Sequence, residues 1–279
     1  MLNKSTPIFK DYIWGGTRLK EEYGKKTELP RVAESWEVYE GPVLMKLIDA
    51  RENLSVQVHP DDAYARGVEN GTGKTEMWVI LDCEPGAFIY FGFNREMTRE
   101  EVRERIRDGT LTETLRVLPV RRGDVVFIPA GTIHAIGAGI VLAEVQQNSD
   151  LTYRVYDFNR VGADGKPREL HIEKALDVLR FLPSSPAAPG SCILNGDADH
   201  QLERLTKNEF FIADRLTLSG QYKHNADTGL ILLCVEGDCA LRRDQEETHV
   251  TKGDCVTLPS GETSFSGIGA FILTKCPGM

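Results

Sequence analysis

The sequence predicts a mainly β protein made of two small barrel-like modules with a few short helices. Short apolar or alternating runs recur along the chain and are separated by Gly, Pro, Asn and Asp, a rhythm typical of barrels and sandwiches. The 279 residues suffice for one large all-β domain or two small ones. A twelve-residue pattern also occurs twice, which favours two modules of related structure.

Seven runs have the length and composition of strands. They are residues 43–49, 54–59, 75–81, 87–91, 125–128, 140–146 and 151–158. A helical insert is expected near 98–118, because Thr98 and Glu101 form a capping box and Val102 and Ile106 lie four apart on one face behind it. We expect only short helices outside these strands.

The boundaries of the modules follow from composition. An amphipathic helix is expected over 171–180, and the Pro-rich run 183–190 cannot pack regularly. We therefore expect a metal-binding module over 1–185, a linker over 186–205 and a second β-rich module over 206–279.

Composition excludes several classes of function. The net charge of −9 argues against a general nucleic-acid or anionic-membrane surface, so an anionic ligand needs a local cluster of Lys and Arg. No apolar run reaches the length of a membrane span, and the N-terminal residues lack the apolar stretch of a signal peptide.

The six cysteines have no Cys-x-x-Cys spacing and fit small buried hydrophobes. We expect a cytoplasmic protein with reduced thiols. Its oligomeric state stays open.

The repeated pattern is Gly, five residues, Pro, one residue, Gly, two residues and then a polar residue. It runs from Gly123 to His134 and again from Gly253 to Ser264, and 253 − 123 = 130 residues separate the copies. Each copy predicts a turn, a strand and a Pro-x-Gly turn that aims the next side chain inward. The pattern resembles the second sequence motif of the cupins, which implies two cupin-type jelly-roll modules. Because Ser264 is a poor ligand, we expect metal only in the first module.

The run from Leu54 to Asp61 predicts a strand with one polar face. Side chains alternate across a strand, so Ser55, Gln57 and His59 point one way and the apolar residues point the other way. An amide and an imidazole two residues apart can converge on one ion.

Further donors come from two other places. Lys74 and Glu76 share a face at the start of the next strand, and His134 ends the first repeat. The predicted ligands are Gln57, His59, Glu76 and His134. Taken singly, a histidine before a proline or a glutamate at a strand start is more often an ordinary capping or solvated residue. Together, nitrogen and oxygen donors without thiolate suit one zinc ion per chain, with cobalt, nickel, manganese or iron as alternatives.

These motifs together resemble the type I mannose-6-phosphate isomerases in their short bacterial form. The resemblance covers residues 7–180 well and the C-terminal module weakly. It is carried by Ser-Val-Gln-Val-His-Pro-Asp at 55–61, Lys-Thr-Glu at 74–76, Pro-Ala-Gly-Thr-Ile-His-Ala at 129–135 and Asn-Ser-Asp-Leu-Thr-Tyr-Arg at 148–154. Thr75 stands where the family has Pro. The long helical domain of larger members is absent, which leaves the lid and sugar discrimination open.

The resemblance also implies roles for residues. It places the zinc ligands on the four donors above, the catalytic groups on Arg154, Lys74, Glu144 and Asp150, and phosphate contacts on Ser55, Lys46 and Arg160. Arg154 and Arg160 would share a strand face if that strand is unbroken. Either Glu144 or Asp150 could be the general base, and Lys74 could transfer a proton if its pKa is depressed. Alternatively, each of these carboxylates is only a structural partner of Arg154.

The expected activity is the interconversion of mannose 6-phosphate and fructose 6-phosphate through an enediolate. A divalent cation and a permanently charged arginine are suited to stabilise that species. Two alternatives stay open: a cupin isomerase of another sugar or sugar phosphate, and a non-catalytic cupin that senses a sugar. Beyond this small molecule, we expect neither nucleic acid nor membrane as a partner.

Overall fold

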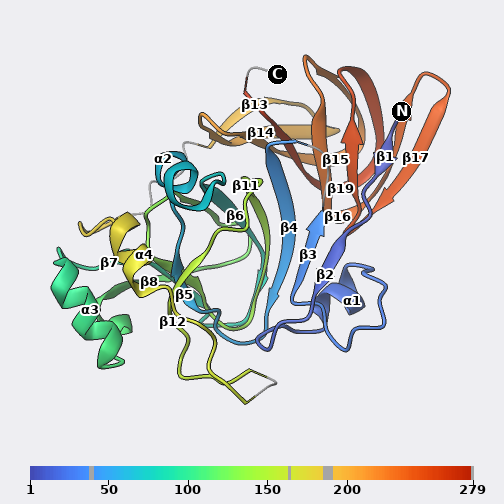
Figure 1. The fold of residues 1–279 in the computed structure, drawn as a ribbon. Coiled ribbons are helices and arrows are strands. Elements are labelled where there is room, and N and C mark those ends of the chain that lie inside the picture. The colour runs from blue at the N-terminus through green and yellow to red at the C-terminus, as the bar shows by residue number, and fades with distance from the viewer. Residues whose placement is uncertain (38–40, 163–164, 185–190, 278–279) are drawn as a thin grey trace.

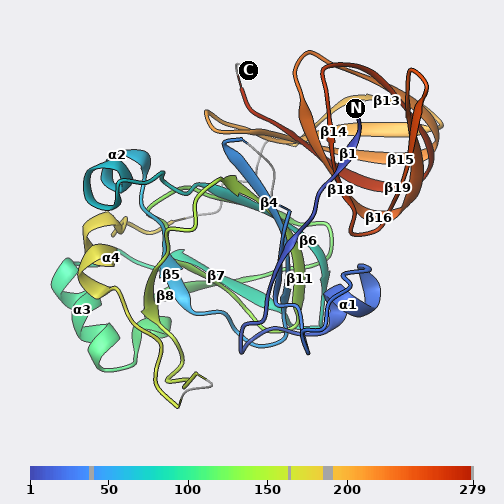
Figure 2. The same ribbon diagram turned by 45° about the vertical axis from the view of Figure 1, so that its right-hand side comes forward.

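The computed structural model describes residues 1–37, 41–162, 165–184 and 191–277. Within them the strands form three antiparallel sheets, two in an N-terminal barrel and one in a C-terminal barrel beside it (Figures 1 and 2). The prediction of a mainly β fold is confirmed. None of the helices in the described ranges has the length and apolar character needed to cross a membrane.

The N-terminal barrel contains a six-stranded and a five-stranded sheet. In spatial order the first is β2 (Ile8–Lys10), β3 (Glu34–Glu37), β4 (Val43–Ala50), β11 (Ile140–Gln147), β6 (Glu76–Cys83) and β9 (Val125–Ile128). The second is β12 (Tyr153–Tyr156), β5 (Val56–Val58), β10 (His134–Ile136), β7 (Phe88–Phe93) and β8 (Leu115–Pro119). Apolar residues of both sheets, among them Ile48, Trp78, Phe91 and Leu142, form one core between them.

Helices cover the outer face of the five-stranded sheet (Figure 1). They are α3 (Arg99–Arg107) and α4 (Ile172–Val178); shorter helical segments elsewhere are α1 (Arg18–Glu22), α2 (Asp62–Tyr64), η1 (Ala65–Glu69) and η2 (Leu111–Thr114). The predicted start of α3 is confirmed, since Thr98 Oγ1 accepts a hydrogen bond from the Glu101 amide at 3.2 Å. Val102 and Ile106 are buried on its inner face, which anchors the helix to the sheet.

The C-terminal barrel is built from one eight-stranded sheet. Its order is β1 (Asn3–Lys4), β18 (Cys255–Leu258), β16 (Leu230–Arg243), β19 (Gly261–Lys275), β15 (Ile212–Ala226), β14 (His200–Lys207) and β13 (Cys192–Gly196), with β17 (Glu246–Thr251) beside β16. Leucines and phenylalanines such as Leu232, Phe265 and Phe271 form the core of this barrel.

The two copies of the sequence repeat begin with the same turn. Gly123 and Gly253 both have φ of +93°, in the region where glycine avoids strain. The Gly123 amide donates to the Ile80 carbonyl at 2.8 Å, and the Gly253 amide donates to the Cys234 carbonyl at 2.8 Å. Each turn leads into a strand, β9 in one barrel and β18 in the other. The repeat therefore marks equivalent strands of the two barrels.

The boundaries of the modules differ from the prediction in two respects. Residues 192–205, predicted as linker, contain β13 and most of β14 of the C-terminal sheet. The side chains of β13 are exposed throughout, so no apolar alternation announces it. Second, β1 pairs with β18, which places residues 3–4 in the C-terminal barrel. Residues 186–190 of the predicted linker lie outside the described residues.

Candidate active site

Three strands bring the predicted metal ligands together. His59 directly follows β5, Glu76 is the first residue of β6, and His134 is the first residue of β10. β10 pairs with β5 so that His134 lies opposite Gln57, and the Gly131 amide donates to the His59 carbonyl at 2.8 Å. His59, Glu76 and His134 each place a ligand atom within 4.8 Å of the others' ligand atoms. The structure therefore brings three of the four predicted ligands together, and Gln57 lines the adjoining pocket.

Hydrogen bonds fix the orientation of both imidazoles. His59 Nδ1 lies 2.9 Å from the Leu151 carbonyl oxygen, and His134 Nδ1 lies 2.8 Å from the Thr132 carbonyl oxygen. A carbonyl only accepts, so each Nδ1 carries the proton and each Nε2 keeps its lone pair. Burial, and then the Lys74 ammonium, hold the pKa of His59 well below its ordinary value, so this ring is neutral.

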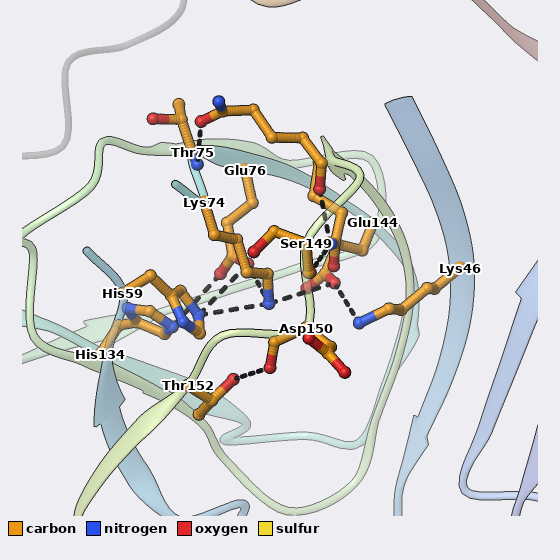
Figure 3. A network of polar contacts seen from close by, with 12 residues as sticks. Lys46, His59, Lys74, Thr75, Glu76, His134, Glu144, Ser149, Asp150 and Thr152 are labelled. Atoms are coloured by element: carbon orange, nitrogen blue, oxygen red, sulfur yellow. Dashed lines mark hydrogen bonds and ion pairs between the residues drawn. The ribbon is translucent and has the colours of Figure 1, made fainter. Parts of the chain in front are cut away.

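The freed lone pairs face the carboxylate of Glu76 (Figure 3). His134 Nε2 lies 3.2 Å from Glu76 Oε1, and His59 Nε2 lies 3.5 Å from Glu76 Oε2. Two atoms that each lie about 2.0–2.1 Å from a tetrahedral zinc ion are about 3.3 Å apart. Glu76 Oε1 and His134 Nε2 are buried without a hydrogen-bond partner among the described residues, and Glu76 Oε2 faces the Lys74 ammonium. Such a set of facing acceptors fits a divalent cation held by His59, Glu76 and His134.

A chain of charged groups leads away from this cluster (Figure 3). Lys74 Nζ lies 2.8 Å from Glu76 Oε2 and 3.7 Å from Glu144 Oε1, and Lys46 Nζ lies 3.2 Å from the same Glu144 oxygen. Burial alone would lower the pKa of Lys74, but Glu144 and Glu76 outweigh it and raise that pKa above its ordinary value. The shift is thus opposite to the depressed pKa that a shuttling lysine requires. Glu144 Oε2 accepts a hydrogen bond from Trp78 Nε1 at 2.8 Å.

A polar cavity of about 350 Å³ adjoins these groups. Seven residues predicted to belong to the site line it: Lys46, Ser55, Gln57, Lys74, Glu144, Asp150 and Arg154. Arg154 Nε donates to Ser55 Oγ at 3.2 Å, which ties β12 to the segment before β5. Neither Glu144 nor Asp150 is hydrogen-bonded or ion-paired to Arg154 within the described part of the chain, so the alternative that they only position this arginine lacks support.

The cavity also contains residues to which the sequence analysis gave no role. They are Lys10, Tyr12, Trp14, Glu34, Trp36, Thr152 and Arg168, together with apolar residues of the barrel core. Lys10 lies on β2, which no motif marks, whereas Trp-Gly-Gly at 14–16 and Glu-Ser-Trp-Glu at 34–37 are segments that also fit the resemblance to the family. Arg168 lies in the loop between β12 and α4, where its charge is the only signal in the sequence.

Arg160 lies outside this cavity. Strand β12 ends at Tyr156, and Phe158 and Asn159 then have φ of +53° and +55°, so the chain turns before it reaches Arg160. Arg160 instead donates to the Asn53 carbonyl at 2.6 Å and to Asp157 Oδ1 at 2.5 Å. The prediction that Arg154 and Arg160 share one strand face is wrong, because two non-glycine residues adopt the left-handed conformation between them.

Fold and site together define a two-barrel cupin with a candidate divalent-metal centre at a polar pocket. The family model for the cupin domain of mannose-6-phosphate isomerase matches residues 201–274. The chain is 36% identical over 299 residues to mannose-6-phosphate isomerase ManA of Bacillus subtilis, with 93% of each chain covered. It is 35% identical to mannose-6-phosphate isomerase of Streptococcus mutans, with 89% of each chain covered. The chain belongs to the mannose-6-phosphate isomerase family.

Solved structures agree with this assignment. The crystal structure of mannose 6-phosphate isomerase from Bacillus subtilis matches with a TM-score of 0.91 and 30% identity over 98% of both chains. A mannosephosphate isomerase described as putative, from Archaeoglobus fulgidus, matches with a TM-score of 0.76 at 19% identity, which supports the fold alone.

Proposed function

We propose that the protein is a metal-dependent mannose-6-phosphate isomerase that interconverts mannose 6-phosphate and fructose 6-phosphate through an enediolate. One observation carries this proposal: the lone pairs of His59 and His134 face the Glu76 carboxylate at 3.5 and 3.2 Å, beside a cavity lined with cations. Its family membership supports the choice of sugar phosphate.

The reaction moves a proton between C1 and C2 and creates negative charge on the sugar oxygens. A divalent ion such as zinc, when bound, polarises a carbonyl or hydroxyl oxygen of the sugar. The Lys74 ammonium lies beside the three metal ligands and is a hydrogen-bond donor for those oxygens. Arg154 lines the same cavity and keeps its charge, so it is suited to stabilise the enediolate.

Glu144 is the better placed of the two carboxylates for proton transfer. It is buried and lines the cavity, and its Oε1 faces the ammonium groups of Lys46 at 3.2 Å and of Lys74 at 3.7 Å. Asp150 also lines the cavity, but its side chain is exposed at the rim. A general base has to lie within hydrogen-bond reach of the proton it removes, which favours the carboxylate beside the metal ligands. We assign proton transfer to Glu144 and leave Asp150 a contact at the rim.

Ser55 and Lys46 remain proposed substrate contacts, because both line the cavity. Lys46 lies between two carboxylates, 3.2 Å from Glu144 and 3.8 Å from Glu34, and packs over the Trp36 ring at 4.4 Å. These contacts hold its ammonium close to Glu144. The position of the Lys46 ammonium favours contact with the sugar hydroxyls near the reacting carbons as well as with phosphate.

An isomerase assay with and without chelator tests the proposal. The purified protein is incubated with mannose 6-phosphate, and in a separate reaction with fructose 6-phosphate, and interconversion is followed. We expect turnover in both directions, loss of turnover after chelation, and recovery when zinc, cobalt, nickel, manganese or iron is added back. Full turnover after the metal content has been shown to be zero would overturn metal dependence. No turnover in any metal-loaded sample would overturn the assigned reaction.

A further inference from the structure

Two arginines bind one buried carboxylate at the side of the cavity, and a third arginine is tied to the same loop. Asp157 is 5% exposed. Its Oδ2 accepts from Arg168 Nε at 2.7 Å, and its Oδ1 accepts from Arg168 Nη2 and from Arg160 Nη2, both at 2.5 Å. Arg154 is tied to the same loop, because its Nη1 donates to the Glu169 carbonyl at 3.0 Å and its backbone amide donates to His171 Nδ1 at 3.2 Å.

The two arginines that bind Asp157 differ in where they lie. Arg168 lines the cavity that contains Lys74, Glu144 and Arg154, and Arg160 does not. The fork of Arg168 is fixed on one side by Asp157 through Nε and Nη2. Its Nη1 has no protein hydrogen-bond partner within the described residues. The Nε and Nη2 atoms of Arg168 are therefore held by Asp157, and its Nη1 is available to donate to a ligand.

The charges at this side of the cavity do not balance. Asp157 and Glu52, which lies 4.0 Å from Arg160 Nη1, carry two negative charges against the three positive charges of Arg154, Arg160 and Arg168, so this group has a net charge of +1. Burial lowers the pKa of Arg154, and the like charge of Arg168 lowers it further. An anion bound at the free edge of Arg168 relieves this repulsion. Its hydrogen bonds to that guanidinium group are charge-assisted, a geometry that suits phosphate oxygens.

We propose that Arg168 binds the phosphate group of the substrate beside Arg154 and thereby determines the preference for a phosphorylated sugar. This inference rests on the proposed function, since it assigns one group of that substrate. Arg160 helps to position Arg168, because both guanidinium groups donate to the Asp157 carboxylate. The role expected for Arg160 from the sequence thus passes to a residue eight positions further along the chain.

The test compares Arg168→Ala with the matched variant Arg160→Ala, because both remove one arginine from Asp157 but only the first removes a cation from the cavity. For mannose 6-phosphate, Arg168→Ala should raise KM about 10- to 100-fold, the range of a lost hydrogen bond to a charged group. Its kcat should change less than threefold, since the contact is present in ground state and transition state alike. Arg160→Ala should raise KM less than threefold, and Arg168→Lys should recover part of the loss.

A second measurement does not depend on catalysis. Inorganic phosphate is titrated into each metal-loaded protein by calorimetry, and its inhibition constant is measured where there is turnover. Arg168→Ala should weaken phosphate binding at least tenfold, and Arg160→Ala should leave it near the wild-type value. Slow turnover of unphosphorylated mannose should be the same in Arg168→Ala and in the wild type.

Several results would overturn the inference. Equal effects of the two alanine variants on phosphate binding would show that Arg168 acts only through Asp157. An equal loss with mannose would show that Arg168 does not recognise phosphate.

If the wild type bound phosphate in an Arg168-dependent way but did not isomerise either hexose phosphate, the phosphate site would be supported and the proposed reaction would be refuted. If the Arg168→Ala protein is unfolded by circular dichroism, Arg168→Lys and Arg168→Gln decide by the same two measurements.

Discussion

At the scale of single residues, the site depends on which nitrogen of each imidazole carries a proton. Backbone carbonyls of Leu151 and Thr132 fix this for His59 and His134, so both Nε2 lone pairs point at Glu76. Strand alternation in the sequence predicts which side chains share a face, but it does not predict the tautomer. The carbonyl oxygens come from backbone positions whose orientation depends on the whole fold.

His134→Ala should abolish metal binding and isomerase activity and leave the fold intact. The ligand is added to an existing barrel, and a tetrahedral site that loses one of its few protein ligands binds metal far more weakly. Metal per chain by atomic absorption should fall from about one to near zero, with an unchanged far-ultraviolet circular dichroism spectrum. His249→Ala, a change at an exposed residue of the C-terminal barrel, is the control. Full metal occupancy in His134→Ala would refute the ligand assignment.

Glu144→Gln and Asp150→Asn separate the two candidate bases. The glutamine keeps an oxygen that accepts from Trp78 Nε1, so the local structure should survive. General-base catalysis contributes about 10²- to 10⁴-fold, and Glu144→Gln should lower kcat by that range. Asp150→Asn should lower kcat less than about tenfold, since its side chain lies at the rim. Steady-state kinetics on mannose 6-phosphate decides, and the opposite ranking would move the base to Asp150.

At the scale of elements, the sequence predicts strands well where one face is apolar and marked by turn residues. The expected strands at 43–49 and 125–128 correspond to β4 and β9, and the capped helix at Thr98 is confirmed. A strand that was missed carries no such pattern, since the side chains of β13 are exposed on both faces.

Arg160 was misplaced because the sequence Phe158-Asn159 does not predict a left-handed turn. Arg168 was missed because loops bring residues together without periodicity.

β19 provides a matched pair for testing the C-terminal core. Phe271 is fully buried among leucines, and Ile268 on the same strand is 71% exposed. Phe271→Ala should lower the free energy of unfolding by about 3–5 kcal/mol, because it removes buried contacts and leaves a cavity. Ile268→Ala should change it by less than about 0.5 kcal/mol. Urea unfolding followed by fluorescence measures both; similar losses would show that the core does not depend on Phe271.

At the scale of the whole molecule, a further apolar cluster joins the two barrels. The outer face of the six-stranded sheet, with Met45, Val79 and Val145, packs on Phe211 and Ile272 of the C-terminal barrel. A buried ion pair between Lys25 and Glu37 lies at this junction. Lys25 Nζ also donates to the Gly253 carbonyl at 2.6 Å, in the second copy of the repeat. Both faces of β4 are therefore buried, and its apolar run is interrupted only by Lys46 and Asp49.

Lys25→Met should lower the free energy of unfolding by about 3–5 kcal/mol, because it leaves the buried Glu37 carboxylate without its charged partner. The double variant Lys25→Met/Glu37→Gln should lose less, since the uncompensated charge is gone, one of the Ser5 and Ser35 hydroxyls can still donate to the amide oxygen and the other can accept from the amide NH2. Urea unfolding of both variants gives the comparison. If the double variant is the less stable of the two, the pair does not act through its charge.

The short strand β1 has a consequence for the order of folding. Asn3 pairs with Thr257, so these partners leave the ribosome 257 − 3 = 254 residues apart. At about 5–20 residues per second, the N-terminal strand waits roughly 12–50 s for its neighbour. The N-terminal barrel can close in that interval, but the pairing of β1 with β18 has to wait until Thr257 has been made. Closure of the second barrel thereby depends on residues that are synthesised well before the rest of that barrel.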